Sequence, residues 1–276
     1  SSLFRAAALG QAKGEMQAVP VPDTRFDAIV KQVQPKKATP ATVIFHDHIE
    51  PINGDAGQRM FSQRFLDEAR KMDCLLHVVR AFESPMAAYH AEVNPMRDLE
   101  AVEVEMVIND LAIMENRLER LKKSLNLKTP GHADYLENDL FTRIKPMLEE
   151  GTPIRAIEMD EEEQKIVRNY QFLSGKQTVI AFNVGEDDAA EAPATLKSKI
   201  QELAAKGTQA FTVCASIEEE IAQLDEADRG EFLESLGLAN PASHRVIQAI
   251  YDALGLITFF TAGENDTRAW PLKKGS

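Results

Sequence analysis

The segment IAFNVGE at residues 180–186 decides the fold, because an unbroken apolar run ends there in polar side chains and a glycine. A continuous apolar run is typical of a strand that is covered on both faces of a sheet. Two further segments share this pattern, VVRAFE at residues 78–83 and VCAS at residues 213–216. In an open α/β sheet, the carboxyl ends of the strands form the crevice where ligands bind. The three segments therefore predict one binding site assembled from distant parts of the chain.

The composition is that of an ordinary globular protein. The chain has 276 residues, of which 44% are hydrophobic and 27% are charged, enough for one or two domains with a sizeable core. The net charge of −13 argues against bulk capture of nucleic acid or anionic membrane, so a polyanionic partner would have to meet a local basic patch.

Neither the cysteines nor the hydropathy pattern indicates secretion or a membrane. Cys74 and Cys214 both lie in apolar, strand-like runs, where reduced cysteines pack as small hydrophobic residues. No run of ~20 apolar residues and no signal-peptide pattern occurs in the sequence. We therefore expect a cytoplasmic protein.

The order of the predicted elements favours an α/β fold. Apolar runs predict buried strands, and helical stretches lie between them. The strands are expected at residues 41–45, 74–79, 178–182 and 210–214, and the helices at residues 59–71 and 194–206. Strands that alternate with helices predict a doubly wound, mostly parallel sheet, whose right-handed crossovers align the strand ends along one edge.

A helical hairpin interrupts this order between the second and third strands. Apolar residues recur at alternating spacings of three and four, which predicts one long seam resembling that of a coiled coil. The seam residues are Val104, Val107, Leu111, Met114, Leu118, Leu121 and Leu125. After a turn that contains Pro130, a returning helix is expected to present Leu136, Leu140, Ile144 and Met147. The charged outer faces are typical of a solvated surface and do not by themselves indicate a partner.

Three smaller features complete the interpretation from the residues. The acidic cluster at residues 160–163 predicts the start of a helix rather than a metal site, because negative charge complements the helix dipole. Two strands are expected at residues 256–263 and 267–272, and they should belong to a larger sheet because an isolated hairpin is marginal in water. His132 and His244 have no neighbours at ligand spacing, so we assign them no chemistry.

An ordered set of motifs resembles the YchF/Obg-like ATPase family, a branch of the P-loop GTPase superfamily that is related to translation factors. The motifs are VPVPD at 19–23, PATV at 40–43, HVVRAFE at 77–83, NPMRD at 94–98, NVGE at 183–186, FLESLGL at 232–238, and the stretch 256–270. The resemblance implies a P-loop nucleotide-binding domain in residues 1–93 and 152–255, an inserted coiled-coil hairpin in residues 94–151, and the start of a β-grasp-like TGS domain in residues 256–276.

The resemblance also implies how the base of ATP or GTP is held. Phe82, Asn183 and Val184 would line the base pocket, and the loop of Cys214, Ala215 and Ser216 would close over the base. Ordinary GTPases end this strand with N-K-x-D, whose carboxylate accepts hydrogen bonds from guanine. Here the corresponding acid is Glu186, which relaxes guanine selection.

The phosphate site implied by the resemblance lies at the start of the sequence. Ser1 and Ser2 match the residues that follow the P-loop lysine, so Ser1 would be the hydroxyl that binds Mg²⁺. Asp47 of the second switch would reach the same ion through water. We expect the glycines and lysine of the P-loop, the first switch loop and the rest of the TGS domain to belong to the polypeptide rather than to have been lost.

The second switch departs from the family pattern D-x-A-G-L, because residues 47–51 read DHIEP. Glu50 replaces the glycine, and a carboxylate ~4 Å from a phosphate charge is opposed by ~4 kcal/mol at an effective dielectric of about 20. Pro51 removes an amide donor and restricts the residue before it. His48 offers a group that could orient water, although a polar switch loop needs no catalyst to explain it.

Two functions follow from the resemblance. The first is a slow, Mg²⁺-dependent ATPase or GTPase that acts as a switch, with ribosomes or translation factors as partners. The second is a divergent paralogue, impaired in hydrolysis, that senses nucleotide and acts as an interaction module. A third interpretation, an unrelated coiled-coil scaffold, explains the hairpin but leaves the three strand-end motifs unexplained.

Overall fold

The computed structural model describes residues 16–47, 60–84, 92–125, 133–238 and 240–275, and the statements below concern those residues. The chain divides into two compact units. The first consists of Ser1–Ile49, Leu76–Tyr89 and Thr178–Ser276, and the second of Glu50–Leu75 and His90–Gln177. Each unit is described by itself.

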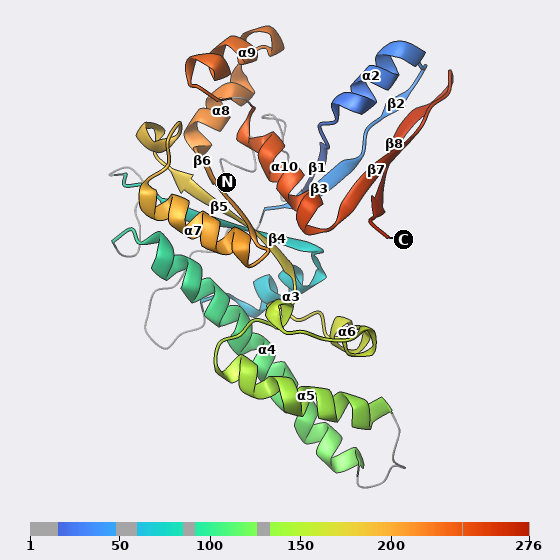
Figure 1. Ribbon diagram of the computed structural model, residues 1–276, viewed down its shortest axis with the longest axis vertical. Coiled ribbons are helices and arrows are strands. Elements are labelled where there is room, and N and C mark those ends of the chain that lie inside the picture. The colour runs from blue at the N-terminus through green and yellow to red at the C-terminus, as the bar shows by residue number, and fades with distance from the viewer. Residues whose placement is uncertain (1–15, 48–59, 85–91, 126–132, 239, 276) are drawn as a thin grey trace. The chain divides into compact units, whose positions relative to one another are not determined.

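The first unit contains a three-stranded sheet in which β5 (Gln177–Val184) lies between β4 (Cys74–Ala81) and β6 (Gln209–Val213) (Figure 1). β5 and β6 are parallel, with Val179 opposite Gln209. Helix α7 (Ala194–Ala205) connects these two strands and packs against β6. Residues 178–182 of β5 are buried, as the continuous apolar run predicts. The predicted α/β fold with a parallel sheet is confirmed.

Three helices follow the sheet in the first unit: α8 (Ala215–Gln223), α9 (Glu226–Ser235) and α10 (Ala242–Ala253). Glu218, on the first turn of α8, is only 3% exposed. Its carboxylate accepts hydrogen bonds from the backbone N–H of Ala242 at 2.7 Å and of Ser243 at 3.3 Å. These are the first two residues of α10, where the N-cap residue is a proline that has no side-chain acceptor. Glu218 therefore fixes α8 to the start of α10.

The prediction for residues 41–45 is correct as a strand but wrong in its pairing. β3 (Thr42–His46) is antiparallel to β1 (Met16–Pro20), and the two form a sheet of their own in the described part of the chain. Thr42 and Ile44 are exposed, so this strand is not covered on both faces. A short apolar run does not identify its partner, and β1 was missed because its sequence, MQAVP, contains no comparable run.

The two strands predicted near the end of the sequence form an antiparallel hairpin, β7 (Leu256–Thr261) and β8 (Thr267–Lys273). As expected, the hairpin belongs to a larger sheet, because β2 (Ala38–Thr39) pairs in parallel with β8. Helix α2 (Thr24–Val33) contributes to the hydrophobic core of this region. That core contains Val19, Val21, Phe26, Ala41, Ile247, Tyr251 and Ala269.

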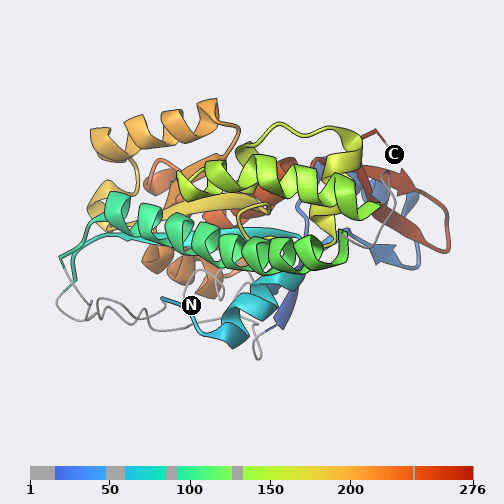
Figure 2. The same ribbon diagram turned by 90° about the horizontal axis from the view of Figure 1, so that it is seen from below.

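The second unit is built on a long helix, α4 (Pro95–Leu125), which lies beside the returning helix α5 (Ala133–Glu149) (Figures 1 and 2). We call α4 and α5 together the helical arm. The other elements of this unit are α3 (Gln63–Lys71), a short 3-10 helix η1 (Ile154–Ala156) and α6 (Glu161–Arg168). The turn predicted around Pro130 lies outside the described residues.

The predicted seam of the arm is correct in its central part and, on α4, as far as Leu121. The buried positions of α4 include Val107, Met114, Leu118 and Leu121. The first three share one core with residues of α5, namely Leu140, Phe141, Ile144 and Leu148. Val104 and Leu136, by contrast, are 43% and 52% exposed, so their assignment to the seam is wrong. Near its start, α4 packs on α3 through Val102 and Met106. In this part of α4 the buried face is the one that contacts α3, and Val104 does not lie on it.

The acidic cluster starts a helix, as predicted. Asp160 is the N-cap of α6 and its Oδ1 accepts the backbone N–H of Glu163 at 2.8 Å. Oε2 of Glu163 accepts the backbone N–H of Asp160 at 3.1 Å, which completes a capping box. Within the described ranges, no group of three or more His, Cys, Asp or Glu side chains is placed to hold a metal ion.

Both cysteines are free thiols. Among the helices that the structure describes, none combines the length and the apolar character needed to cross a bilayer.

Candidate functional site

The carboxyl ends of β5 and β6 meet through the side chain of Asn183. The strand register places Asn183 opposite Val213, the last residue of β6. Oδ1 of Asn183 accepts the backbone N–H of Ala215 at 3.0 Å, so this side chain ties the end of β5 to the loop after β6. Its Nδ2 group makes no hydrogen bond within the described residues, and it remains available to donate to a ligand.

Phe82 follows β4, the remaining strand of this sheet, and lies one residue after its end. A Cβ atom added to Gly185 would lie 3.8 Å from Cβ of Phe82, so the backbone after β5 passes close to this side chain. Arg80 holds Phe82 from two directions. Its Nε donates to the carbonyl oxygen of Phe82 at 3.0 Å, and its guanidinium carbon lies 4.6 Å from the centre of the phenyl ring. Arg80, near the end of the same strand, therefore fixes the orientation of the Phe82 ring.

The loop after β6 leads directly into α8. Cys214 and Ala215 are buried, whereas Ser216 is exposed. Sγ of Cys214 lies 3.2 Å from Oγ of Ser216, within hydrogen-bond distance for sulfur. Glu218 follows within one turn and anchors α8 on α10, which holds the loop in place.

The remaining predicted base-site residues have different environments. Val184 is only 3% exposed, so its side chain belongs to the core and only its backbone is left to face a ligand. Glu186 is exposed and begins a short 3-10 helix, η2 (Glu186–Asp188). The structure thus brings Phe82, Asn183 and the loop 214–216 to one edge of the sheet, with Glu186 close by in the chain.

The predicted phosphate-site residues are only partly described. Ser1 and Ser2 lie outside the described residues, as do His48, Glu50 and Pro51 of the second switch. Asp47 is described and is half-buried, immediately after β3 in the first unit. Its carboxylate is the hard oxygen donor that Mg²⁺ prefers, so the chemistry of this side chain fits the ion that the resemblance implies.

Sequence reasoning assigned no role to Arg80, Gly185 and Glu218. A signal for Arg80 was present, because side chains at i and i+2 of an extended segment point the same way, and Arg80 precedes Phe82 by two residues at the end of β4. Gly185 stands between Asn183 and Glu186 in the NVGE motif, where a close approach of the backbone is a common reason for glycine. Glu218 gave no signal, since its partners on α10 lie 24 and 25 residues further along the chain.

The arrangement suits a flat heterocyclic ring with acceptor atoms on its edge. Phe82 offers an oriented aromatic ring, Asn183 offers a free amide donor, and the loop 214–216 supplies backbone and hydroxyl groups beside it. Rings bind well to aromatic side chains, and a few placed polar groups determine their orientation.

Comparisons with known proteins identify relatives of this chain. The ribosome-binding ATPase YchF of Bacillus subtilis (strain 168) is 34% identical over 260 residues, covering 93% of this chain and 70% of that protein. The protein of the same name from Haemophilus influenzae is 35% identical over 260 residues, covering 94% of this chain and 70% of that protein. The one from Mycoplasma genitalium is 31% identical over 268 residues.

A solved structure, that of the Schizosaccharomyces pombe YchF GTPase, matches the whole chain with a TM-score of 0.85 at 25% identity and is itself covered to 78%. No family model matches the sequence. The extent and identity of the matches to the curated relatives are sufficient to classify the protein: the chain belongs to the YchF family.

Proposed function

We propose that the protein binds ATP or GTP at the edge where β4, β5 and β6 end, and that it works with the ribosome. The main support for the nucleotide site is the hydrogen bond that Ala215 N–H donates to Oδ1 of Asn183, together with the oriented ring of Phe82 at the same edge of the sheet. Relatives of the chain bear the name ribosome-binding ATPase, which supports the ribosome as a partner and the cytoplasm as the location.

Base recognition in this proposal depends on three strand ends. The ring of Phe82 stacks on or against the purine, and Nδ2 of Asn183 donates to a ring nitrogen. The loop of Cys214, Ala215 and Ser216 covers the base, and the backbone of Val184 contributes to the floor. Glu186 stands where a guanine-specific site has aspartate, so we expect ATP and GTP to be accepted without strong discrimination.

Phosphate binding and slow hydrolysis are assigned to residues that match the family pattern. Ser1 and Asp47 would hold Mg²⁺, and Ser2 would contact the nucleotide. Mg²⁺ supplies charge neutralisation at the phosphate oxygens when it is bound. The protein itself would position the nucleotide. It would act on the translation machinery as a switch whose state depends on the bound nucleotide.

The domain organisation implied by the resemblance remains part of this proposal. The nucleotide-binding domain comprises residues 1–93 and 152–255, the helical hairpin is inserted at residues 94–151, and a TGS domain begins at residue 256. The hairpin and the TGS domain are then the segments available for partners.

Calorimetric titration tests nucleotide binding directly. With Mg²⁺ present, both ATP and GTP are expected to release or absorb heat with dissociation constants between about 1 and 100 μM, and phosphate release should be slow and dependent on Mg²⁺. The absence of binding heat with both nucleotides, in a sample shown to be folded, would contradict the proposal.

The second switch departs from the family pattern at Glu50 and Pro51, and this departure favours a second candidate function. In this case the protein binds nucleotide but hydrolyses it poorly and acts as a sensing module. The double variant Glu50→Gly, Pro51→Leu is then expected to raise the rate of phosphate release by about tenfold or more, because ~1.4 kcal/mol of lost repulsion corresponds to that factor. An unchanged rate in the double variant, with unchanged nucleotide affinity, argues against the impaired paralogue.

A further inference from the structure

Arg80 and Phe82 form a closed contact at the end of β4. Nε of Arg80 donates to the carbonyl oxygen of Phe82 at 3.0 Å, while the guanidinium carbon of the same side chain lies 4.6 Å from the centre of the Phe82 ring. A guanidinium is planar and rigid, so the hydrogen bond to the carbonyl oxygen also fixes its position over the ring. One cation therefore holds both the backbone and the side chain of Phe82.

The guanidinium determines which parts of the ring a ligand can reach. It lies over one face of Phe82, so a base has to contact the opposite face or the edge of the ring. Phe82 is half-buried and follows the last residue of β4, a position at which an unsupported ring would exchange between rotamers. A ring that is fixed before the ligand arrives lowers the entropy that binding has to offset.

Another arginine of the first unit makes the same type of contact at a ring to which no binding role is assigned. The guanidinium carbon of Arg25 lies 5.3 Å from the ring centre of Phe260, and two nitrogens of Arg25 donate to the carboxylate of Asp23. Phe260 belongs to the hairpin of β7 and β8 and packs against the hydrophobic core of that region. Arg25 is therefore a suitable comparison for Arg80.

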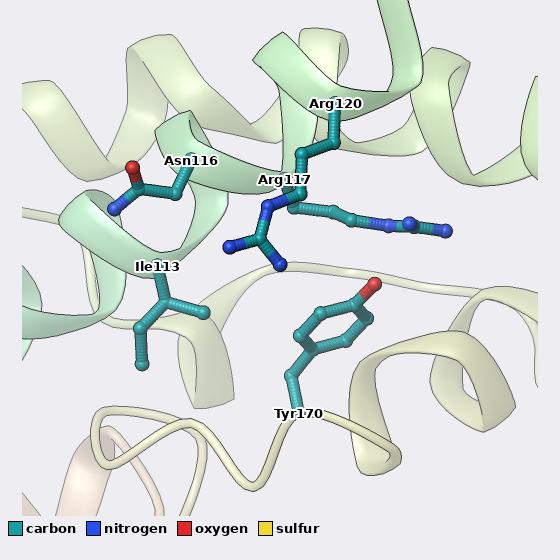
Figure 3. A pocket seen from close by; sticks show the side chains of 5 residues that line it. All are labelled: Ile113, Asn116, Arg117, Arg120 and Tyr170. Atoms are coloured by element: carbon teal, nitrogen blue, oxygen red, sulfur yellow. The ribbon is translucent and has the colours of Figure 1, made fainter. Parts of the chain in front are cut away.

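The second unit also has arginines beside an aromatic ring, in an open pocket of about 360 Å³ on the helical arm (Figure 3). The pocket is lined by Ile113, Asn116, Arg117 and Arg120 of α4 and by Tyr170 of the segment that follows α6. Its volume falls within the range of small-ligand sites. The strand ends therefore have to be compared with this pocket as a place for a base.

Several polar groups of this pocket are committed to partners within the second unit. Nε and one terminal nitrogen of Arg117 donate to the two carboxylate oxygens of Glu137 at 2.9 and 2.7 Å, and the hydroxyl group of Tyr170 donates to the same carboxylate. Nδ2 of Asn116 donates to a backbone carbonyl oxygen of its own helix at 2.8 Å. By contrast, Nδ2 of Asn183 makes no hydrogen bond among the described residues. The strand ends therefore suit a base better than the pocket does.

We infer that Arg80 is a positioning residue of the nucleotide site, which favours purine over pyrimidine bases by holding the Phe82 ring in place. The two fused rings of a purine overlap a fixed phenyl ring over a larger area than the single ring of a pyrimidine does. A ring that is free to turn loses much of this difference. The role of Arg80 rests on the proposed nucleotide site and adds to it the group that selects the class of base.

Calorimetric titration of Arg80→Met with ATP and with UTP, both in the presence of Mg²⁺, tests this role. Methionine keeps an unbranched side chain but has no charge and no donor. Because ATP and UTP carry the same ribose and phosphates, the ratio of their affinities reports the base alone. The affinity for ATP is expected to fall by about fivefold and the affinity for UTP by less than about twofold. Arg80→Lys keeps a cation without the planar donor group, so its ratio should lie between those of the wild type and Arg80→Met.

A double-mutant cycle shows whether Arg80 acts through the ring. In the Phe82→Leu background, Arg80→Met should leave the ratio of the ATP and UTP affinities unchanged. Arg25→Met is the matched control in the first unit, and Arg120→Met is the control for the pocket of the helical arm. Each control should change either affinity by less than about twofold.

Failure of this role and failure of the nucleotide site give different results. Folded wild-type protein that binds neither nucleotide would overturn the proposed function, and the role of Arg80 with it. Wild-type protein that binds ATP and UTP equally, or an unchanged preference for ATP in Arg80→Met, would overturn only the role of Arg80. Equal losses of both affinities would also overturn it, because Arg80 would then act on the phosphates or on the fold. Circular dichroism and the thermal midpoint report whether each variant folds; if Arg80→Met does not fold, Arg80→Lys in the same cycle decides the question.

Discussion

Asn183→Ala is expected to weaken binding of ATP by about 10- to 100-fold, the largest effect of any single substitution in the base site. Two interactions disappear together. Nδ2 no longer donates to the purine, and the N–H of Ala215 loses the oxygen that accepts its hydrogen bond at 3.0 Å. Calorimetric titration with ATP in the presence of Mg²⁺ measures the change.

Asn183→Asp separates the two roles of this side chain. The aspartate keeps an oxygen for Ala215 N–H but has no donor for the base, so a loss close to that of Asn183→Ala assigns the effect to the base contact. The matched control is Asn109→Ala on α4, which removes a half-buried amide that bonds within its own helix, with Nδ2 donating to the carbonyl oxygen of Glu105 at 2.8 Å. Wild-type affinity in Asn183→Ala would contradict the assignment of this residue.

Asp110→Ala is expected to lower the free energy of unfolding by about 3 kcal/mol, the largest effect on stability. Asp110 lies on α4 and has no exposed surface. Its two carboxylate oxygens accept the backbone N–H of Leu173 at 2.9 Å and of Ser174 at 2.6 Å. The alanine leaves both buried donors without an acceptor, in the segment that precedes β5. Urea denaturation measures the change.

The control for Asp110 is Asp139→Ala. Asp139 is exposed on α5 and makes no hydrogen bond or ion pair in the described part of the chain. Its removal should change the free energy of unfolding by less than about 0.5 kcal/mol. Equal effects of the two substitutions would show that the buried carboxylate does not hold the arm to the chain before β5.

Asp110 should also make stability depend on pH. Burial raises the pKa of Asp110 above its ordinary value of 3.8, although the backbone hydrogen bonds oppose the shift. The folded protein therefore keeps this proton at pH values where the unfolded chain has released it. The contribution of this group to the free energy of unfolding then falls as the pH rises from about 3.8 to the raised pKa. Asp110→Asn should remove this component of the slope.

Much of the fold follows from local patterns in the sequence. The apolar run of β5 predicts its burial, the acidic cluster predicts the start of α6, and the recurring apolar residues predict the two helices of the arm. Each of these signals is local, because it depends on the periodicity or the capping chemistry of one segment.

The features that sequence reasoning missed depend on which segments pack together. The pairing of β1 with β3 and the exposure of Val104 are both decided by distant partners. In the candidate site, the three strand ends were predicted to converge, but the support of Phe82 by Arg80 and the anchoring of α8 by Glu218 were not. The pocket of the arm combines Tyr170 with residues 113–120, a juxtaposition that no periodicity indicates.

Photolabelling can show whether separate strand ends converge on one purine. The protein is irradiated with 8-azido-ATP and Mg²⁺, with and without excess ATP, and the labelled peptides are identified by mass spectrometry. If they do, labels that ATP suppresses are expected in the peptides containing Phe82, residues 183–186 or residues 214–216. Labels that ATP suppresses only in other peptides, such as those containing residues 113–120 or Tyr170, would contradict this convergence.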